Sequence, residues 1–360
     1  MMNHRLSYKI IFLLAAFTME AGAQAFYQPG TVRAGKNLHA PLDPPEQHDV
    51  DHFWQVEPEI KLHHFGLGEG KNIVVVHGGP GFPPDSPWPG IVPLKKEYRI
   101  HFYDQRGCGE STRSVDKFAS PNYFQNMTDL DKALGLGAHI ADIERIRRIL
   151  GVEKLILIGH SYGGFISSLY AVEFPEHVEA LVLVAPADTL VWPPKGDSLF
   201  DVVGQCLPKG KGEEFKTFLK DYLDYGKIFS RSEADLIGMN QRLASYIMAA
   251  YEEKGIFTNT GTKREGIGGW VSHAVYFSTG FRYDYRDTLK NMAAPALVIH
   301  GAKDLQPEKA SRAYADGFPN ARFEVMAGSS HFPYSEEPEE FSRLIKGFLA
   351  KEKPQGEKGG

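Results

Sequence analysis

The chain has 360 residues, of which 42% are hydrophobic and 24% charged, and its net charge at neutral pH is −5. This length and apolar content are sufficient to bury a large core in one α/β domain with an inserted cap. The acidic balance and the lack of a basic tract, a phosphate-binding loop or metal-spaced Cys/His pairs argue against a nucleic-acid partner, a bound nucleotide and a metal site.

Residues 1–23 have the pattern of a signal peptide. Two basic residues precede an apolar run from Ile10 to Phe17, and Ala21-Gly22-Ala23 supplies the small residues that a signal peptidase accepts. The alternative is an uncleaved membrane anchor, but the run is shorter than the roughly 20 residues that a spanning helix needs. We therefore expect a protein exported to the periplasm or the medium, with no stable membrane insertion after cleavage.

The next segments alternate between strand-like and helix-like sequence. Residues 24–58 form an N-terminal extension with an extended, Pro-rich part. Apolar runs typical of buried strands then recur near residues 59–65, 73–77, 99–103, 154–160, 179–184, 295–300 and 322–327. The clearest helix runs from Ala138 to Leu150, and Gly151 ends it. This alternation predicts an α/β fold whose mostly parallel sheet has helices on both faces.

Residues 186–290 interrupt this pattern with helix-like, aromatic-rich sequence, which predicts an inserted helical cap. The core is then split into residues 59–185 and 291–350, followed by a disordered tail, 351–360. The aromatic side chains of the cap either line a pocket above the site or pack the cap's own core; they are Tyr222, Tyr225, Phe229, Trp270, Tyr276 and Phe277.

The motif Gly159-His160-Ser161-Tyr162-Gly163 lies between an apolar strand and a helix-compatible stretch. Strand, sharp turn and helix in this order are typical of a nucleophile elbow, whose glycines permit a strained turn that exposes the serine hydroxyl. We therefore predict that Ser161 is a nucleophile. The alternative is an ordinary glycine-rich turn.

An aspartate and a histidine follow Ser161 in the chain order of the α/β-hydrolases. Asp304 follows the strand-like residues 296–301, and His331 follows the last strand. We predict that His331 is the general base and that Asp304 orients it, although Asp304 could instead cap the helix that begins nearby. Two histidines beside the site, His77 and His160, fit packing or turn positions better.

Two backbone N–H groups should face the oxyanion of the reaction. Tyr162 follows the nucleophile directly and supplies one of them. We predict the other at Gly79, in the turn His77-Gly78-Gly79-Pro80-Gly81 that follows an earlier strand.

A further motif is the segment Asp104-Gln105-Arg106-Gly107-Cys108-Gly109-Glu110-Ser111. With this motif, the turn at residues 77–81 and the three triad segments, the chain resembles the prolyl aminopeptidase (proline iminopeptidase) family of α/β-hydrolase serine peptidases. The likeness spans roughly residues 60 to 350. The resemblance implies the α/β-hydrolase fold, the triad and oxyanion donors given above, and no cofactor. It also implies that Asp104 and Arg106 brace the loop beside the site.

The chain departs from this family at two places. At the elbow, His160 and Tyr162 replace the second glycine and the tryptophan of Gly-Gly-Ser-Trp-Gly. The family holds the substrate's free amine with acidic residues of the cap. Glu252 could supply one, whereas His273 stands where another is expected.

We therefore predict an exported serine hydrolase that cleaves small peptide or amide substrates through an acyl-enzyme. The alternatives are an esterase or other acyl hydrolase, and a non-catalytic binding protein on the same fold. The two cysteines, Cys108 and Cys206, lie in different regions, and we predict neither a disulfide nor a catalytic thiol. The sequence leaves the oligomeric state open.

Overall fold

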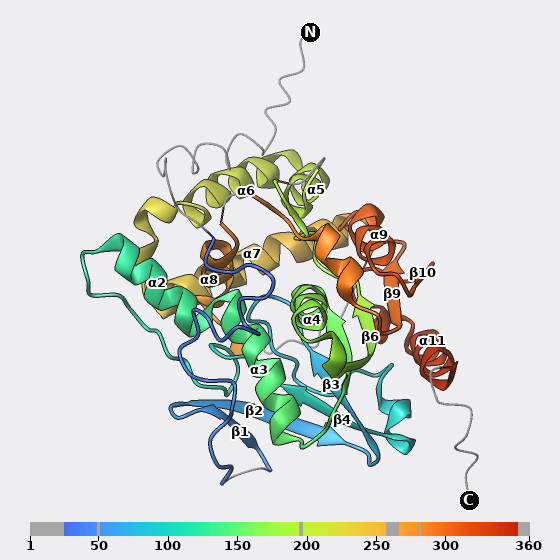
Figure 1. The fold of residues 1–360 in the computed structure, drawn as a ribbon. Helices are drawn as coiled ribbons and strands as arrows, with labels where there is room; N and C mark the ends of the chain where they lie inside the picture. Colours follow the sequence, from blue (N-terminus) through green and yellow to red (C-terminus); the bar gives the residue numbers. More distant parts are fainter. Residues whose placement is uncertain (1–24, 49–50, 194–196, 257–265, 281, 352–360) are drawn as a thin grey trace, which may run out of the picture.

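The computed structural model describes residues 25–48, 51–193, 197–256, 266–280 and 282–351. An eight-stranded sheet in the order β1-β2-β4-β3-β5-β6-β9-β10 forms its centre (Figure 1). The strands are β1 (Phe53–Glu57), β2 (Ile60–Leu67), β3 (Lys71–Val76), β4 (Tyr98–Tyr103), β5 (Leu155–His160), β6 (Val178–Val184), β9 (Ala296–Gly301) and β10 (Ala321–Met326). The strands from β4 to β10 in this order are parallel, whereas β2 pairs antiparallel with β4 and with β1.

The predicted mostly parallel sheet is confirmed, and each of the predicted strand-like runs corresponds to an observed strand. Strand β1 departs from the prediction, because it lies within residues 24–58, for which the sequence predicts an extension outside the core. It joins the sheet because Trp54 and Val56 alternate with less buried residues and pack into the core.

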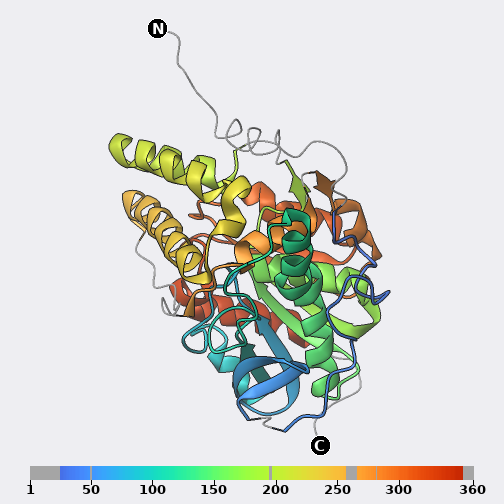
Figure 2. The same cartoon turned by 90° about the vertical axis from the view of Figure 1, so that its left-hand side faces the viewer.

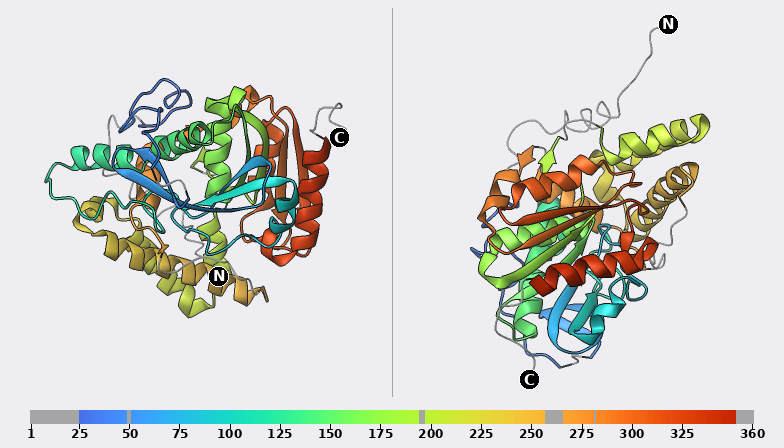
Figure 3. Two further views of the ribbon diagram at one scale, coloured as in Figure 1. Left: turned by 90° about the horizontal axis from the view of Figure 1, so that it is seen from below. Right: turned by 90° about the vertical axis from the view of Figure 1, so that its right-hand side faces the viewer.

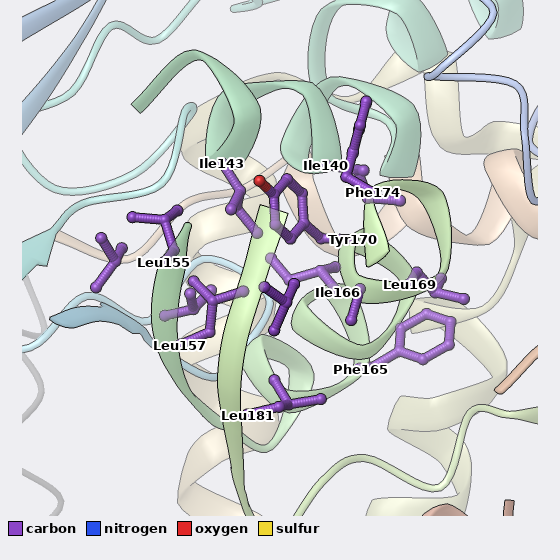
Figure 4. Packing of buried hydrophobic residues seen from close by; sticks show 14 of the residues in the cluster. Ile140, Ile143, Leu155, Leu157, Phe165, Ile166, Leu169, Tyr170, Phe174 and Leu181 are labelled. Atoms are coloured by element: carbon purple, nitrogen blue, oxygen red, sulfur yellow. The ribbon is translucent and has the colours of Figure 1, made fainter. Parts of the chain in front are cut away.

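Helices cover both faces of the sheet, as Figure 3 shows. Alternate residues of β5 point to opposite faces, so Leu155 and Leu157 join one core cluster while Ile156 and Ile158 join the other. The first face is covered by α3 (Leu136–Ile149), α4 (Tyr162–Glu173) and α9 (Glu308–Gly317), and the second by η1 (Val92–Lys96) and α11 (Pro338–Lys351). Figure 4 shows the packing of α3 and α4 over β5 and β6.

The elements between β6 and β9 are mostly helical and lie at one end of the sheet in Figure 1. They are β7 (Val191–Trp192), α5 (Leu199–Cys206), α6 (Lys209–Tyr222), η3 (Tyr225–Ser230), α7 (Glu233–Glu253), α8 (Val271–Thr279), β8 (Tyr283–Asp284) and η5 (Arg286–Asn291). Figure 2 shows α6 and α7 together on one side of the molecule. All six aromatic residues that we singled out in this segment belong to one hydrophobic cluster or pack against it, together with α2 (Tyr123–Leu134).

Residues that follow the predicted signal peptide are anchored to the core. The side chain of Tyr27 is buried, and its backbone N–H donates to the carbonyl of Ser278 at 2.9 Å. The carboxylate of Glu173 accepts from the backbone N–H groups of Gly30 and Arg33 at 2.8 and 3.0 Å. The signal peptide itself and residues 352–360 of the predicted tail lie outside the described residues. Within the described part of the chain, no helix has both the length and the apolar character needed to cross a bilayer.

Candidate active site

Ser161 lies at the sharp turn between β5 and α4, with φ 52° and ψ −119°. A positive φ is unfavourable for a residue with a Cβ, so the surrounding structure must hold this conformation. The backbone of Ser161 donates to the carbonyl of Val184 at 2.9 Å and accepts from Ala187 at 3.0 Å. Its side chain makes no capping hydrogen bond to α4. The turn therefore has the strained geometry that the sequence predicted for a nucleophile elbow.

The glycines of the elbow are required by close backbone packing. A Cβ on Gly163 would lie 2.0 Å from the carbonyl oxygen of Val76, and one on Gly159 would lie 2.5 Å from the carbonyl oxygen of Gly163. A Cβ on Gly78 would lie 3.0 Å from Cβ of Ser161. The turn after β3 thus lies directly against the elbow, where an oxyanion site needs to be.

Asp304 and His331 meet beside the elbow. Nδ1 of His331 is 2.7 Å from Oδ2 of Asp304, and the Asp304 side chain is fully buried. The ring of His331 lies 4.8 Å, between centroids, from that of His160, the residue before Ser161. The structure therefore brings Asp304 into contact with His331 and places His331 against the residue that precedes Ser161, because β5, β9 and β10 all end at the same edge of the sheet.

The second oxygen of Asp304 has two donors of its own. Oδ1 accepts from the hydroxyl of Tyr251 at 2.7 Å and from the backbone N–H of Gln306 at 2.9 Å. Helix α9 begins at Glu308 with Pro307 as its N-cap, so Asp304 is not the cap of that helix. The alternative role that we considered for Asp304 is therefore not the one observed.

These contacts fix the protonation pattern of the pair. Burial alone would raise the pKa of Asp304, but the charge of His331 and hydrogen bonds from His331, Tyr251 and Gln306 lower it below its usual range. Burial would lower the pKa of His331, but the charge and hydrogen bond of Asp304, together with the charge of Glu336, raise it. Because the carboxylate accepts, Nδ1 of His331 carries a proton and Nε2 of the neutral ring is left as the acceptor.

The loop before His331 is held by two acids. Glu336 is the last residue of α10 (Pro333–Glu336), and Glu337 follows it directly. Glu336 accepts from the backbone N–H of Ser330, and Glu337 accepts from the hydroxyl of Ser329 at 2.6 Å and from the N–H of Gly328 at 3.0 Å. These charge-assisted hydrogen bonds hold the backbone of the loop that leads to His331.

His77 and His160 have structural contacts, as we predicted for both. His77 accepts from the backbone N–H of Gln105 at Nε2, 3.1 Å, and its Nδ1 donates to the carbonyl of Gly78 at 2.7 Å. Nε2 of His160 donates to the carbonyl of His331 at 2.8 Å. Burial lowers the pKa of both histidines. Neither takes the position of a base in contact with an acid.

Gly79 has φ +126°, and a Cβ there would lie 2.6 Å from the backbone nitrogen of Gly81. Tyr162 is the first residue of α4, so its N–H is among those at a helix N-terminus that have no partner within the helix. Both predicted oxyanion donors thus lie at the ends of β3 and β5, on the turns that pack against each other.

The loop with Asp104 and Arg106 is braced as the resemblance implies. Asp104 accepts from the backbone N–H of Glu110 at 2.9 Å and is 3.0 Å from Nδ1 of His63. Arg106 is fully buried and forms ion pairs with Glu57 at 2.7 Å and Asp142 at 2.6 Å. Its charge is therefore used inside the core and is not available to a substrate.

The two predicted substrate-binding residues of the cap lie in contrasting environments. Glu252 is exposed on the last turn of α7, next to Tyr251. His273 is fully buried in α8 and packs against Tyr222 and Tyr225, and within the described part of the chain neither of its ring nitrogens has a hydrogen-bond partner. Burial lowers the pKa of His273 to about 3, so the ring is neutral at physiological pH.

Both cysteines are free: Cys108 is buried and Cys206 is partly exposed on α5. Burial raises the pKa of the Cys108 thiol well above its usual range, which disfavours the reactive thiolate. Among the residues with described positions, no group of three or more His, Cys, Asp or Glu side chains is arranged to hold a metal ion.

Residues 71–338 match the family described as the alpha/beta hydrolase fold. The chain belongs to the α/β-hydrolase family. Among curated proteins, it is similar to the proline iminopeptidase of Lactobacillus delbrueckii subsp. bulgaricus, with 27% identity over 286 residues that cover 77% of this chain and 89% of the relative. The predicted fold class and the resemblance to proline iminopeptidases are confirmed.

Two solved structures share the fold of this chain. A proline iminopeptidase from Mycobacterium smegmatis matches with a TM-score of 0.51 and 22% identity, covering 82% of this chain and 96% of that one. An esterase from Exiguobacterium antarcticum matches with a TM-score of 0.54 and 19% identity, covering 83% and 99%. At these identities the two structures establish the fold alone.

The contact between Tyr251 and Asp304 could not be predicted from the sequence. No local motif marks the residue, because the contact joins the end of a cap helix to a loop 53 positions later.

Proposed function

We propose that this α/β-hydrolase is a serine hydrolase in which Ser161 is the nucleophile, His331 the general base and Asp304 the residue that orients it. The observation that carries the proposal is the 2.7 Å contact between Nδ1 of His331 and Asp304 beside a serine held at positive φ. Strain at a serine between strand and helix, together with a buried acid-histidine pair, is the arrangement that activates a hydroxyl.

In the proposed reaction, Oγ of Ser161 attacks the substrate's carbonyl carbon and its proton passes to Nε2 of His331. The N–H groups of Gly79 and Tyr162 stabilise the oxyanion. His331 then returns the proton to the leaving amine or alcohol as the carbonyl bond to it breaks. Water, deprotonated by the same imidazole, releases the acyl group from Ser161.

Labelling with a fluorophosphonate probe and turnover of the Ser161→Ala variant test this assignment. We expect the wild type to be labelled and Ser161→Ala to be unlabelled, with kcat lower by roughly 10⁴-fold. Ser167→Ala is a matched control, since Ser167 lies on α4, the helix that follows Ser161, and is fully buried with a hydroxyl that has no hydrogen-bond partner among the described residues. Near-normal turnover in Ser161→Ala would refute the catalytic assignment and favour the non-catalytic alternative.

We propose small peptide or amide substrates, because of the similarity to the proline iminopeptidases. An enzyme that removes an N-terminal residue must stabilise the substrate's free ammonium group, and Glu252 is the candidate acid. If it acts so, N-acetylation of the substrate lowers kcat/KM by about tenfold or more. Glu252→Gln should cause much of the same loss on the free-amine substrate, whereas Glu253→Gln, which changes an adjacent exposed acid, should not.

The second candidate function is an esterase or other acyl hydrolase. The state of His273 favours it, because a neutral imidazole stands where the resemblance leads us to expect a second acid. A panel of prolyl, alanyl and leucyl amides and short-chain esters distinguishes the two. Equal rates on free and N-acetylated amides, with faster turnover of esters, would exclude the aminopeptidase function.

We also propose export through residues 1–23. Mass spectrometry of the protein from its native host should find an N-terminus shortly after Ala23 or Ala25. A chain that starts at Gln24 keeps Tyr27 and the contacts of Glu173, so we expect it to fold and to have unchanged turnover. Full-length protein in the cytosol would contradict export.

A further inference from the structure

Tyr251 is the described cap residue whose side chain reaches the acid of the proposed triad. It lies on the last turn of the 21-residue helix α7 and is buried, with an exposed fraction of 2%. Its hydroxyl donates to Oδ1 of Asp304 at 2.7 Å. The other oxygen of the same carboxylate is bonded to His331.

The direction of this hydrogen bond follows from the neighbouring donor. The backbone N–H of Leu305 donates to the Tyr251 oxygen at 3.4 Å. Because that oxygen accepts from Leu305, the hydroxyl proton is directed to the carboxylate. Burial and the charge of Asp304 raise the pKa of Tyr251 well above its usual range, so the hydroxyl remains a donor at any pH used in an assay.

Helix α7 is fixed at its other end. Its first residue, Glu233, accepts from the backbone N–H groups of Gly269 and Trp270 at 2.9 Å each and pairs with Arg113 at 2.7 Å. A helix of 21 residues is roughly 30 Å long at about 1.5 Å per residue. The helix therefore links the loop that follows β4 to the triad, and its position determines where the Tyr251 hydroxyl lies.

We propose that Tyr251 is a positioning residue of this hydrolase, which holds Asp304 in the orientation that His331 requires and makes the proposed triad dependent on the position of the cap. This inference rests on the proposed function of the triad. The hydroxyl acts in two ways. It prevents rotation of the carboxylate, and it withdraws negative charge from the oxygen pair that stabilises the His331 imidazolium.

Other charged and titratable groups also face His331. They are Asp304 after β9, Glu336 on α10, His160 on β5 and His300 on β9. Of these four groups, Asp304 is the one that accepts a described hydrogen bond from the hydroxyl of Tyr251. A change in the titration of His331 on loss of that hydroxyl therefore reports on Asp304.

The variant Tyr251→Phe tests the proposal, since it removes one oxygen and keeps the ring in the cap cluster. We expect kcat to fall about tenfold with KM nearly unchanged, because the carboxylate is less well oriented. With one donor fewer, Asp304 stabilises the imidazolium more strongly, so the acid limb of kcat/KM should move to higher pH by roughly half a unit.

Tyr246→Phe is the matched control on the same helix. Tyr246 is buried, and its hydroxyl accepts from Arg242 at 3.2 Å without contact to Asp304. We expect wild-type kcat and an unmoved acid limb in this variant, with similar unfolding temperatures for both. The pH dependence of fluorophosphonate labelling provides a second measurement of the His331 pKa in each protein.

The outcomes separate this inference from the proposed function. If Ser161→Ala is inactive and Tyr251→Phe has the kcat and acid limb of Tyr246→Phe, the positioning role is wrong and the triad stands. If Ser161→Ala keeps its turnover, the proposed function itself fails. A fall in kcat without movement of the acid limb in either measurement would also overturn the role that we assign to the hydroxyl.

Discussion

Replacement of Asp304 by asparagine should place the proton of His331 on the wrong nitrogen. In the wild type, Oδ1 accepts from Tyr251 and Gln306, which are both donors. The oxygen of an asparagine amide must therefore take the position of Oδ1, and its NH₂ group must face Nδ1 of His331. Nδ1 then has to accept a hydrogen bond, so the proton of the neutral ring moves to Nε2. A protonated Nε2 cannot receive the proton of Ser161.

We expect Asp304→Asn to lower kcat by roughly 10⁴-fold, which is about 5.4 kcal/mol of transition-state stabilisation at 1.36 kcal/mol for each factor of ten. Loss of the negative charge should also move the pKa of His331 downward, because that charge raises it in the wild type. The measurements are kcat on the best substrate of the panel and the pH dependence of fluorophosphonate labelling. Asp316→Asn, an exposed change on α9, controls for the substitution itself.

Near-normal turnover of a folded Asp304→Asn protein would refute the reasoning. So would a large loss accompanied by an upward movement of the His331 pKa, since an uncharged amide cannot stabilise the imidazolium better than a carboxylate does.

Three more outcomes follow from the structure. Wild-type activity should fall as pH decreases through the raised pKa of His331, because the protonated ring cannot accept a proton; a flat profile between pH 5 and 8 would contradict this. Gly163→Ala should destabilise the fold by about 3 kcal/mol or abolish soluble expression, since its Cβ would lie 2.0 Å from a backbone oxygen, and an unchanged melting temperature would count against it. Glu57→Gln should lower the free energy of unfolding by about 3–5 kcal/mol, because Arg106 and Arg145 are buried against it at 2.7 and 2.8 Å. The pKa of Glu57 is lowered to about 2, so its stabilising contribution is complete above pH 4.5 and is lost as pH falls through 2, which acid unfolding of the wild type and the variant can measure.

The parallel strands and the elbow could be predicted because their signals are local. A buried parallel strand is an uninterrupted apolar run, and the elbow is five adjacent residues with two glycines that the backbone packing requires. Strand β1 could not be found in this way. It is five residues long and lies at the sheet edge, and its pattern emerges only when β2 is beside it.

The buried ion cluster of Arg106 also has no local signal. Its partners are Glu57 on β1 and Asp142 on α3, which are separated from it by 49 and 36 positions. The resemblance implied that Arg106 braces a loop. The structure shows in addition that it links β1 to α3 through two buried ion pairs.

Some residues of the site could likewise be predicted from local sequence, whereas others depend on packing between distant segments. Ser161, Asp304 and His331 each follow a strand of one parallel sheet, and the ends of such strands meet at one edge, so chain order is enough to bring them together. The cap obeys no such rule. Its helices lie between β6 and β9, and which of their side chains reaches the site depends on packing over the whole segment. That is why the sequence led to the exposed Glu252, and the structure leads to its buried neighbour Tyr251, whose hydroxyl is on the carboxylate of Asp304. In a fold that serves many functions, substrate preference depends on the variable segments outside the common core, which here is the cap. The residues that set substrate preference will therefore have to be identified from contacts of the cap rather than from motifs of the core.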